Sequence, residues 1–285
     1  GRVVVDDPGH ALAGMPVSVL LPDGMRNPEG IVPMPLEADP DATALFASSS
    51  GTTGLPKVLA LSQRVIAWRA WQVAHVQAYA PDERVLVPMS SQEYPGKSMR
   101  VYTLIHGGTV VMWPGGAATP PSVPAYCVAM CATTLQLTVL QARALVNDAD
   151  GRDRLPASTR VFLGASRMPA GLPAAFEERI GGRVYNRYGT TEIGIVANMY
   201  PEGDDGTPDS VGRLAAGVEL EIVDEKGRRV PPGESGEIRL RCESMVERYF
   251  DDPVATSRHF SDGWFNPRDV GSITLERALD AVGPW

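Results

Sequence analysis

The sequence has few cysteines, and their spacing suggests neither a covalent nor a metal framework. Three cysteines occur in 285 residues, an odd number without a Cys-x-x-Cys pair, so we predict neither a disulfide scaffold nor a zinc site. Cys127 and Cys131 lie in the apolar run of residues 126–134, where small buried side chains are expected. We interpret all three cysteines as structural and expect a reducing compartment.

Long apolar runs and clusters of positive charge are also lacking. No run approaches the roughly 18 apolar residues of a membrane helix, and the first residues do not resemble a signal peptide. The net charge is -8, and no stripe rich in Lys and Arg offers a surface for nucleic acid. We therefore expect a cytoplasmic protein that inserts into no membrane and binds no nucleic acid.

The composition that remains is that of a folded globular protein. Hydrophobic residues make up 44% and charged residues 21% of the chain, and 29 glycines with 25 prolines indicate many turns. The length allows one large domain or two small ones. The pattern of predicted strands, helices and turns divides the sequence into lead-in strands and loops at residues 1–40, an α/β region at 41–205 and a β-rich region at 206–285.

Strands and helices alternate along the α/β region, which predicts a mostly parallel sheet flanked by helices. Strands are expected at residues 43–47, 58–61, 84–88, 109–113, 126–131, 161–163 and 183–185. Helices are expected from Ser62 to residue 79 and at residues 98–106, 135–147 and 169–180, with Val65, Trp68, Trp71 or Gln72, and Val76 on the buried face of the first. Later strands at residues 218–223, 228–230 and 237–241 predict a smaller antiparallel β unit.

A loop rich in hydroxyls and glycine, residues 48–57, follows the first predicted strand. Two glycines allow close approach of the backbone, five hydroxyl side chains donate hydrogen bonds, and Lys57 supplies a positive charge. These features predict a phosphate-binding loop, and a solvated linker is the alternative. The predicted contacts come from Ser49, Ser50, Gly51, Thr52, Thr53, Gly54 and Lys57.

Two later stretches carry side chains suited to the same ligand. Glu192 follows Thr190 and Thr191 in a glycine-flanked segment, and its carboxylate is a hard oxygen ligand of the kind magnesium prefers. Asp269 follows an aromatic pair and can accept hydrogen bonds from ribose hydroxyls. The alternatives are a solvated turn carboxylate for Glu192 and a turn-capping aspartate for Asp269. Ligands of open α/β sheets bind where the strands end, so these loops are expected to converge.

Together these motifs resemble the adenylate-forming superfamily of acyl- and aryl-CoA synthetases, peptide-synthetase adenylation domains and firefly luciferase. Residues 49–57 match the phosphate loop of that family, residues 164–166 its adenine-side turn, and residues 185–192 its Tyr-Gly-x-Thr-Glu segment. The segments at 210–213, 230–238 and 249–256 follow in the family's order. The resemblance covers roughly residues 41–275.

The resemblance implies roles for named residues. Tyr188 would stack on adenine, Thr191 would contact the α-phosphate, Glu192 would bind Mg²⁺ and Asp269 the ribose, with Lys57, Thr191 and Glu192 catalytic. Further nucleotide contacts would come from Gly164, Ala165, Ser166, Asn186, Arg187, Gly189 and Thr190. The acid substrate is expected near Ser91, Gln92, Tyr94 and Lys97.

The implied activity is ATP-dependent conversion of a carboxylic acid to an acyl-adenylate, followed by thioester formation. ATP and Mg²⁺ would be the cofactors, and CoA or the phosphopantetheine of a carrier protein the acceptor. The sequence departs from the family where Val58 replaces a glycine and Pro267-Arg268 replaces Thr-Gly. The family's C-terminal domain, with its catalytic lysine, and most of its N-terminal subdomain are not in this chain, so we expect a truncated large domain that binds nucleotide and adenylates acids slowly.

Two other functions remain open at this stage. Residues 91–98 nearly spell a P-loop, but Ser91 stands where that motif needs its first glycine and Pro95 removes a backbone donor. The second alternative is a nucleotide-binding or structural remnant without catalysis.

Overall fold

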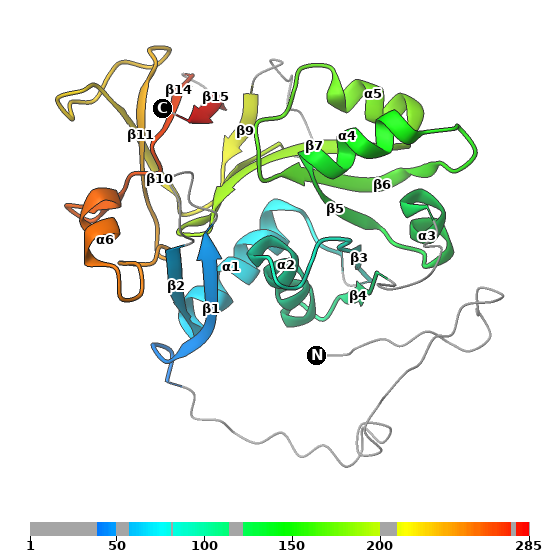
Figure 1. The fold of residues 1–285 in the computed structure, drawn as a ribbon, viewed down its shortest axis with the longest axis horizontal. Helices are drawn as coiled ribbons and strands as arrows, with labels where there is room; N and C mark the ends of the chain where they lie inside the picture. Colours follow the sequence, from blue (N-terminus) through cyan, green and yellow to red (C-terminus); the bar gives the residue numbers. More distant parts are fainter. Residues whose placement is uncertain are drawn as a thin grey trace.

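The computed structural model describes residues 39–49, 57–80, 82–113, 122–199 and 210–274 and the backbone of 278–284. Figure 1 shows the fold. The proposed phosphate loop falls largely outside the described residues, so the predictions for Ser50, Gly51, Thr52, Thr53 and Gly54 stay predictions, as does the lead-in at residues 1–38.

A parallel sheet forms the centre of the α/β region, as the alternation of strands and helices predicted. Its strand order is β4-β3-β5-β6-β7, and every neighbouring pair is parallel. The strands are β3 (Arg84–Leu86), β4 (Thr109–Val111), β5 (Thr134–Thr138), β6 (Leu155–Gly164) and β7 (Gly181–Thr190). The order reverses between β3 and β5, and such a reversal is where open α/β sheets bind ligands.

Helices cover both faces of this sheet (Figure 1). One face packs against α1 and α2 in an apolar cluster that includes Val73, Val85 and Met99. The other face packs against α3, α4 and α5, with Leu163 and Phe176 fully buried between the layers. The helices are α1 (Gln63–Val76), α2 (Tyr94–Ile105), α3 (Val123–Ala129), α4 (Val139–Asp148) and α5 (Leu172–Arg179).

The first two strands do not join the parallel sheet, which corrects one expectation. β1 (Thr43–Ser49) and β2 (Lys57–Ser62) pair with each other in an antiparallel sheet of two strands, with Ser49 opposite Lys57. The connection at residues 50–56 is too short for the crossover of a dozen or more residues that parallel strands require. Ser49 and Lys57 therefore stand side by side at the base of the proposed phosphate loop.

The antiparallel β unit continues the same sheet rather than standing apart. β7 pairs in antiparallel fashion with β8, and the path runs on through β9, β15, β14, β11, β13 and β12, with β10 beside β11. Pairing thus changes direction at β7–β8. The strands are β8 (Gly194–Asn198), β9 (Ser210–Leu214), β10 (Glu219–Val223), β11 (Gly236–Arg241), β12 (Phe260–Ser261), β13 (Trp264–Phe265), β14 (Asp269–Ile273) and β15 (Ala278–Pro284), and α6 spans Pro253–His259.

Three elements differ from their sequence predictions. The strand expected at residues 228–230 is reduced to an isolated bridge between Arg229 and Val223. Residues 126–131, expected as a strand, lie mostly in α3, which Ser122 caps by accepting from the backbone N–H of Ala125. The strand comes next, as β5, and the helix expected from residue 135 begins at Val139 after a capping box of Thr138 and Gln141. A short apolar run is compatible with either a buried helix or a buried strand, so periodicity alone could not distinguish the two.

The buried face of α1 contains Val65, Gln72 and Val76, as expected, and also Arg69, which was not expected there. Ser62 caps the helix as predicted, accepting from the Val65 N–H. Of the two alternatives, Gln72 is the buried one at 0% exposed and Trp71 is 45% exposed, while Arg69 is 1% exposed. The helix therefore turns two polar side chains inward, and their partners lie in distant parts of the chain.

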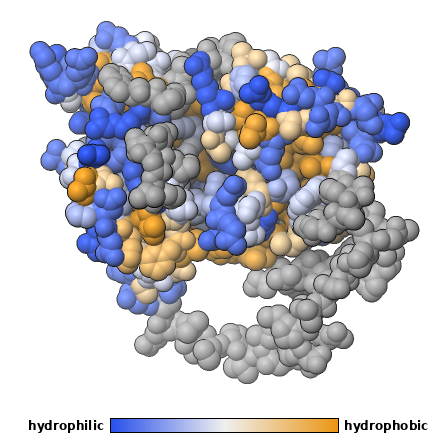
Figure 2. Space-filling model, in the orientation of Figure 1, coloured by the Kyte–Doolittle hydropathy of each residue, from blue (hydrophilic) through white to orange (hydrophobic). Residues whose placement is uncertain are grey.

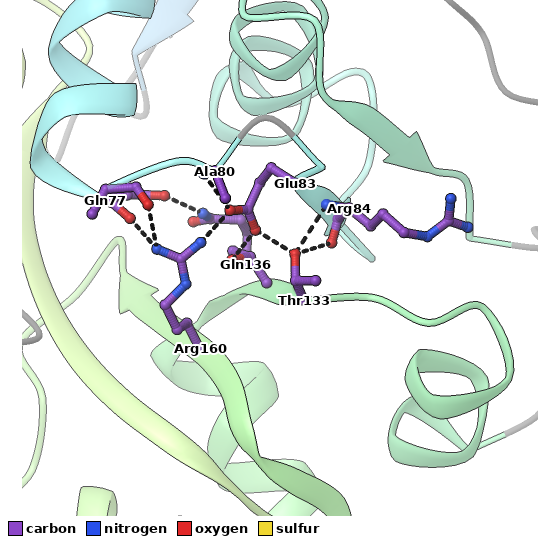
Figure 3. Close-up of polar contacts among 9 residues, drawn as sticks. Gln77, Ala80, Glu83, Arg84, Thr133, Gln136 and Arg160 are labelled. Carbon is purple, nitrogen blue, oxygen red and sulfur yellow. Dashed lines mark hydrogen bonds and ion pairs between the residues drawn. The ribbon is translucent and has the colours of Figure 1, made fainter.

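A polar network joins the end of α1 to the parallel sheet (Figure 3). Glu83, 1% exposed, accepts from the hydroxyl of Thr134 at 2.6 Å and pairs with Arg160 of β6. Burial opposes the charge of this carboxyl, but the hydroxyl donors and Arg160 outweigh it and hold its pKa below the usual value. The network fixes α1 against β5 and β6.

The surface facing the viewer in Figure 2 is mixed in hydropathy. The turn between β10 and β11, at the upper left, is hydrophilic, while an apolar area lies over β1 and β2, where Phe46 is 51% exposed. Among the described residues, no helix has the length and apolar character to cross a membrane.

Candidate active site

Tyr188 and Asp269 come together from β7 and β14. The Tyr188 hydroxyl donates to Asp269 Oδ2 at 2.6 Å. Burial raises the pKa of Asp269, and burial together with that carboxylate raises the pKa of Tyr188 well above its usual value. The phenol therefore keeps its proton and donates a hydrogen bond to the carboxylate.

Glu192 lies in the turn that joins β7 to β8 and is 6% exposed. Its Oε1 accepts from the hydroxyl of Tyr249 at 2.8 Å. Burial, with the nearby Glu192 charge, raises the pKa of Tyr249, so this phenol also stays protonated. Glu192 forms no ion pair with a described residue, and the described residues hold no cluster of three or more metal-binding side chains.

Lys57 reaches the same tyrosine from the start of β2. Its Nζ lies 5.1 Å from the centroid of the Tyr249 ring and 2.8 Å from Nε2 of His259. Lys57 and Glu192, from segments far apart in sequence, thus converge on opposite parts of one aromatic side chain. A cation and a carboxylate held this way, without a direct ion pair, leave both charges available for a third group.

The tautomer of His259 follows from its second contact. His259 Nδ1 lies 2.8 Å from the carbonyl oxygen of Asn266, and a carbonyl can only accept, so Nδ1 carries the hydrogen. Nε2 therefore presents its lone pair to the Lys57 ammonium. Burial lowers the pKa of His259, and the charges of Lys57 and Arg268 lower it further, while the Asn266 contact and Glu192 act in the opposite direction.

The lowered pKa of His259 predicts a pH-dependent contribution to stability. Since its pKa is lower in the folded than in the unfolded protein, its contribution is complete above the unfolded value of about 6.5 and is lost as the pH falls through the folded value. Thermal unfolding at about pH 7 and about pH 5 should show a smaller fall in Tm for His259→Gln than for the unsubstituted protein. His75→Gln, at an exposed position of α1, is the control, and equal falls for all three proteins would contradict the assignment.

Arg69 holds the turn that carries Thr191 and Glu192. Its guanidinium donates to the backbone oxygens of Thr191 at 2.9 Å, Glu192 at 2.7 Å and Ser244 at 2.8 Å. It also donates to the Tyr94 hydroxyl at 2.6 Å. Sequence reasoning missed Arg69 and His259, because neither lies in a motif; Tyr249 begins a matched segment, which was its only signal.

The remaining residues of the Tyr-Gly-x-Thr-Glu segment have structural contacts. A Cβ added at Gly189 would lie 2.4 Å from the Gly194 oxygen, so only glycine allows this close approach at β8. The Thr190 hydroxyl accepts from the Ile193 N–H inside the turn. Asn186 donates to the Ser210 oxygen at 3.2 Å. In the adenine-side turn, Ala165 has a φ of 71° and, with Ser166, is exposed at the end of β6.

Three of the four residues expected near the acid line one pocket of about 180 Å³. The lining consists of Phe46, Ala47, Ser48, Val58, Gln92, Tyr94 and Lys97. Ser91 is not part of it, and its hydroxyl accepts from Arg100 instead.

Helix α2 begins at Tyr94, so Pro95 and Gly96 are helical and residues 91–98 do not form the glycine-rich loop of a P-loop protein.

Comparisons with known proteins agree with this architecture. Two relatives are the sulfoacetate–CoA ligase of Cupriavidus necator, 31% identical over 270 residues, and the indoleacetate–CoA ligase of Aromatoleum aromaticum, 29% identical over 245 residues. The matches cover 90% and 84% of this chain and 51% and 47% of the relatives, so the chain spans about half the length of the curated relatives it matches.

A solved structure shows the same fold. The O-succinylbenzoate coenzyme A synthetase of Bacillus subtilis, in complex with ATP and a magnesium ion, matches with a TM-score of 0.74 and 24% identity, over 86% of this chain and 50% of the other. The model of the AMP-binding enzyme family matches residues 9–250. These matches confirm the resemblance drawn from the motifs, and the chain belongs to the family of AMP-binding enzymes.

Proposed function

We propose that this chain supplies the nucleotide-binding and acid-binding part of an ATP-dependent acid–CoA ligase. The observation that carries the proposal is the convergence of Lys57 and Glu192 on Tyr249, beside the hydrogen-bonded pair of Tyr188 and Asp269. Glu192 is close enough to that pair to raise the pKa of both members. A cation, a buried carboxylate and an aromatic ring with a polar neighbour suit the parts of a nucleoside triphosphate.

The reaction would proceed in two transfers. A carboxylate oxygen of the acid attacks the α-phosphorus, the bond to the bridging oxygen breaks, and pyrophosphate leaves. The thiolate of the acceptor then attacks the acyl carbon and AMP leaves. Catalysis of such transfers depends on positioning and on stabilisation of charge. Lys57 would hold the departing phosphates and Thr191 would orient the α-phosphate.

The residues present fit a magnesium nucleotide. Magnesium in such sites keeps several waters and takes one or two protein carboxylates together with phosphate oxygens, and Glu192 is a single buried carboxylate without an ion pair to any described residue. When bound, the metal would neutralise phosphate charge. Glu192 would hold it, while Asp269, which uses Oδ2 for Tyr188, would accept from ribose through Oδ1.

CoA is the acceptor we propose, in preference to a carrier protein. The matched relatives bear the names of CoA ligases, and the acids in those names range from sulfoacetate and oxalate to indoleacetate. CoA is common to these names, which supports CoA as the acceptor, whereas the acids differ. The identity of the acid therefore depends on the pocket of this chain. The cytoplasmic location remains a prediction from composition.

Acid-dependent release of pyrophosphate tests the proposal. The natural protein is mixed with ATP, Mg²⁺ and a panel of carboxylic acids, and thioester is measured after CoA is added. Lys57→Met should lower the rate of pyrophosphate release by about tenfold to a hundredfold, because one charged contact to the leaving phosphates is lost. Lys226→Met, in the exposed turn after β10, is the matched control. Nucleotide binding without pyrophosphate release for any acid would identify a non-catalytic remnant instead.

A further inference from the structure

Arg187 is a partly buried cation that has no anionic partner among the described residues. Its side chain leaves β7, and Nη1 donates to Oε1 of Gln136 on β5 at 2.9 Å and lies 3.4 Å from the sulfur of Met99 on α2. It forms no ion pair with any described residue. Burial lowers its pKa, as expected for a guanidinium that has lost water and gained no carboxylate.

The alternation of side chains along β7 separates Arg187 from the neighbouring tyrosine. Tyr188 points to Asp269, whereas Arg187 points to the opposite face, where α2 covers the sheet. The guanidinium lies against Gly164 at the end of β6, where an added Cβ would be 3.5 Å from Nε and 3.6 Å from Nη2 of Arg187, in ordinary van der Waals contact. The cation therefore stands beside the candidate nucleotide site but outside the Tyr188–Asp269 pair.

The surroundings of Arg187 offer hydrogen-bond donors. Arg187 can only donate hydrogen bonds, so the Gln136 amide must direct its oxygen toward Arg187. Nε2 of Gln136 then donates to Oε1 of Gln77 at 2.7 Å. Figure 3 shows both glutamines. This orientation leaves Nε2 of Gln77 buried without a partner among the described residues. Nε and Nη2 of Arg187 also make no hydrogen bond with a described residue, and the side chain is only partly buried.

We propose that Arg187 binds a second anionic group, a carboxylate or sulfonate, at the end of the acid substrate remote from the carboxylate that is activated. The inference rests on the proposed function, since it assumes that an acid is held at this site. A guanidinium presents a flat fork of donors that matches an oxyanion with two coplanar oxygens. An anion there would also offset the cost of a cation buried without a counter-charge.

Matched acids test the inference in the natural protein. Succinate and butyrate have the same carbon count and differ in the second charge, and 3-sulfopropionate separates sulfonate from carboxylate. Acid-dependent pyrophosphate release should favour one of the two dianions over butyrate by at least about tenfold in kcat/KM. Dicarboxylates and monocarboxylates of other lengths extend the comparison. The shift in Tm caused by each acid alone gives a second readout without turnover.

Variants assign the preference to Arg187. The inference assigns Arg187 to the acid instead of the nucleotide contact that the family resemblance implied. Arg187→Met should therefore remove the dianion preference and the Tm shift, with the KM for ATP unchanged, while Arg187→Lys should restore part of both. Arg183→Met, at an exposed position of the same strand, should behave as the unsubstituted protein. Equal loss of rate for mono- and dianions, or a raised KM for ATP, would overturn the inference while leaving the proposed function intact. No pyrophosphate release with any acid would overturn the proposed function itself.

Discussion

Replacing Arg69 with methionine is expected to lower the free energy of unfolding by about 2–4 kcal/mol. The substitution keeps much of the apolar stem but removes donors to the backbone oxygens of Thr191, Glu192 and Ser244. Buried acceptors left without partners cost more than the hydrogen bonds themselves contributed. Denaturant unfolding of the natural protein measures the change through the midpoint at constant slope.

Arg64→Met, on the same helix, is the control for this experiment. Arg64 pairs with Asp41, but both side chains are largely exposed, so its loss should change stability by no more than about 0.5 kcal/mol. Arg69→Lys keeps a charge but loses the planar fork, and should be destabilised as well. Unfolding of Arg69→Met at the same midpoint as the unsubstituted protein would show that Arg69 does not hold the turn.

Glu192→Gln is expected to reduce acid-dependent pyrophosphate release by about a hundredfold to a thousandfold, on the scale of removing one preorganised charge-stabilising group. Glutamine keeps the shape and an oxygen that can accept from Tyr249, so the packing of the turn survives. It lacks the negative charge that a hard divalent cation requires. Calorimetry should therefore show weaker binding of magnesium-ATP and nearly unchanged binding of AMP.

Two results would distinguish this role from a structural one. Glu247→Gln, exposed and two residues before Tyr249, should leave both nucleotide affinities unchanged. The Tm of Glu192→Gln should stay close to that of the unsubstituted protein, because no ion pair is lost among the described residues. Equal weakening of AMP and magnesium-ATP binding would remove the metal assignment from Glu192.

Local sequence patterns were sufficient for much of the fold. The alternation of strands and helices predicted the parallel sheet, and turn residues with alternating apolar positions predicted the antiparallel strands at β10 and β11. The predictions failed at α3 and at the start of α4, where a buried apolar run has no periodicity that separates helix from strand. They also failed at β1 and β2, where the short connection at residues 50–56 decides for an antiparallel pair.

The candidate site divides in the same way. Its motifs carry Lys57, Glu192 and Asp269, which could be named from residue type and position, and Tyr188, which the family resemblance implied. Their partners could not, because Lys57 meets His259 across 202 positions and Tyr249 meets Glu192 across 57. A partner at that distance depends on how the strands stack, which no local window contains.

The sequence by itself determined the family, the class of fold and the residues proposed to contact nucleotide, because motifs and periodicity are local properties of the chain. Only the tertiary structure decided which polar groups are paired when water is removed. It gave Arg69 backbone oxygens from the turn and from Ser244, gave His259 a lysine to accept from, and left Arg187 without an anion among the described residues. The physical reason is burial: a charge that is harmless in water needs a partner inside the protein, and the fold determines which partner is present.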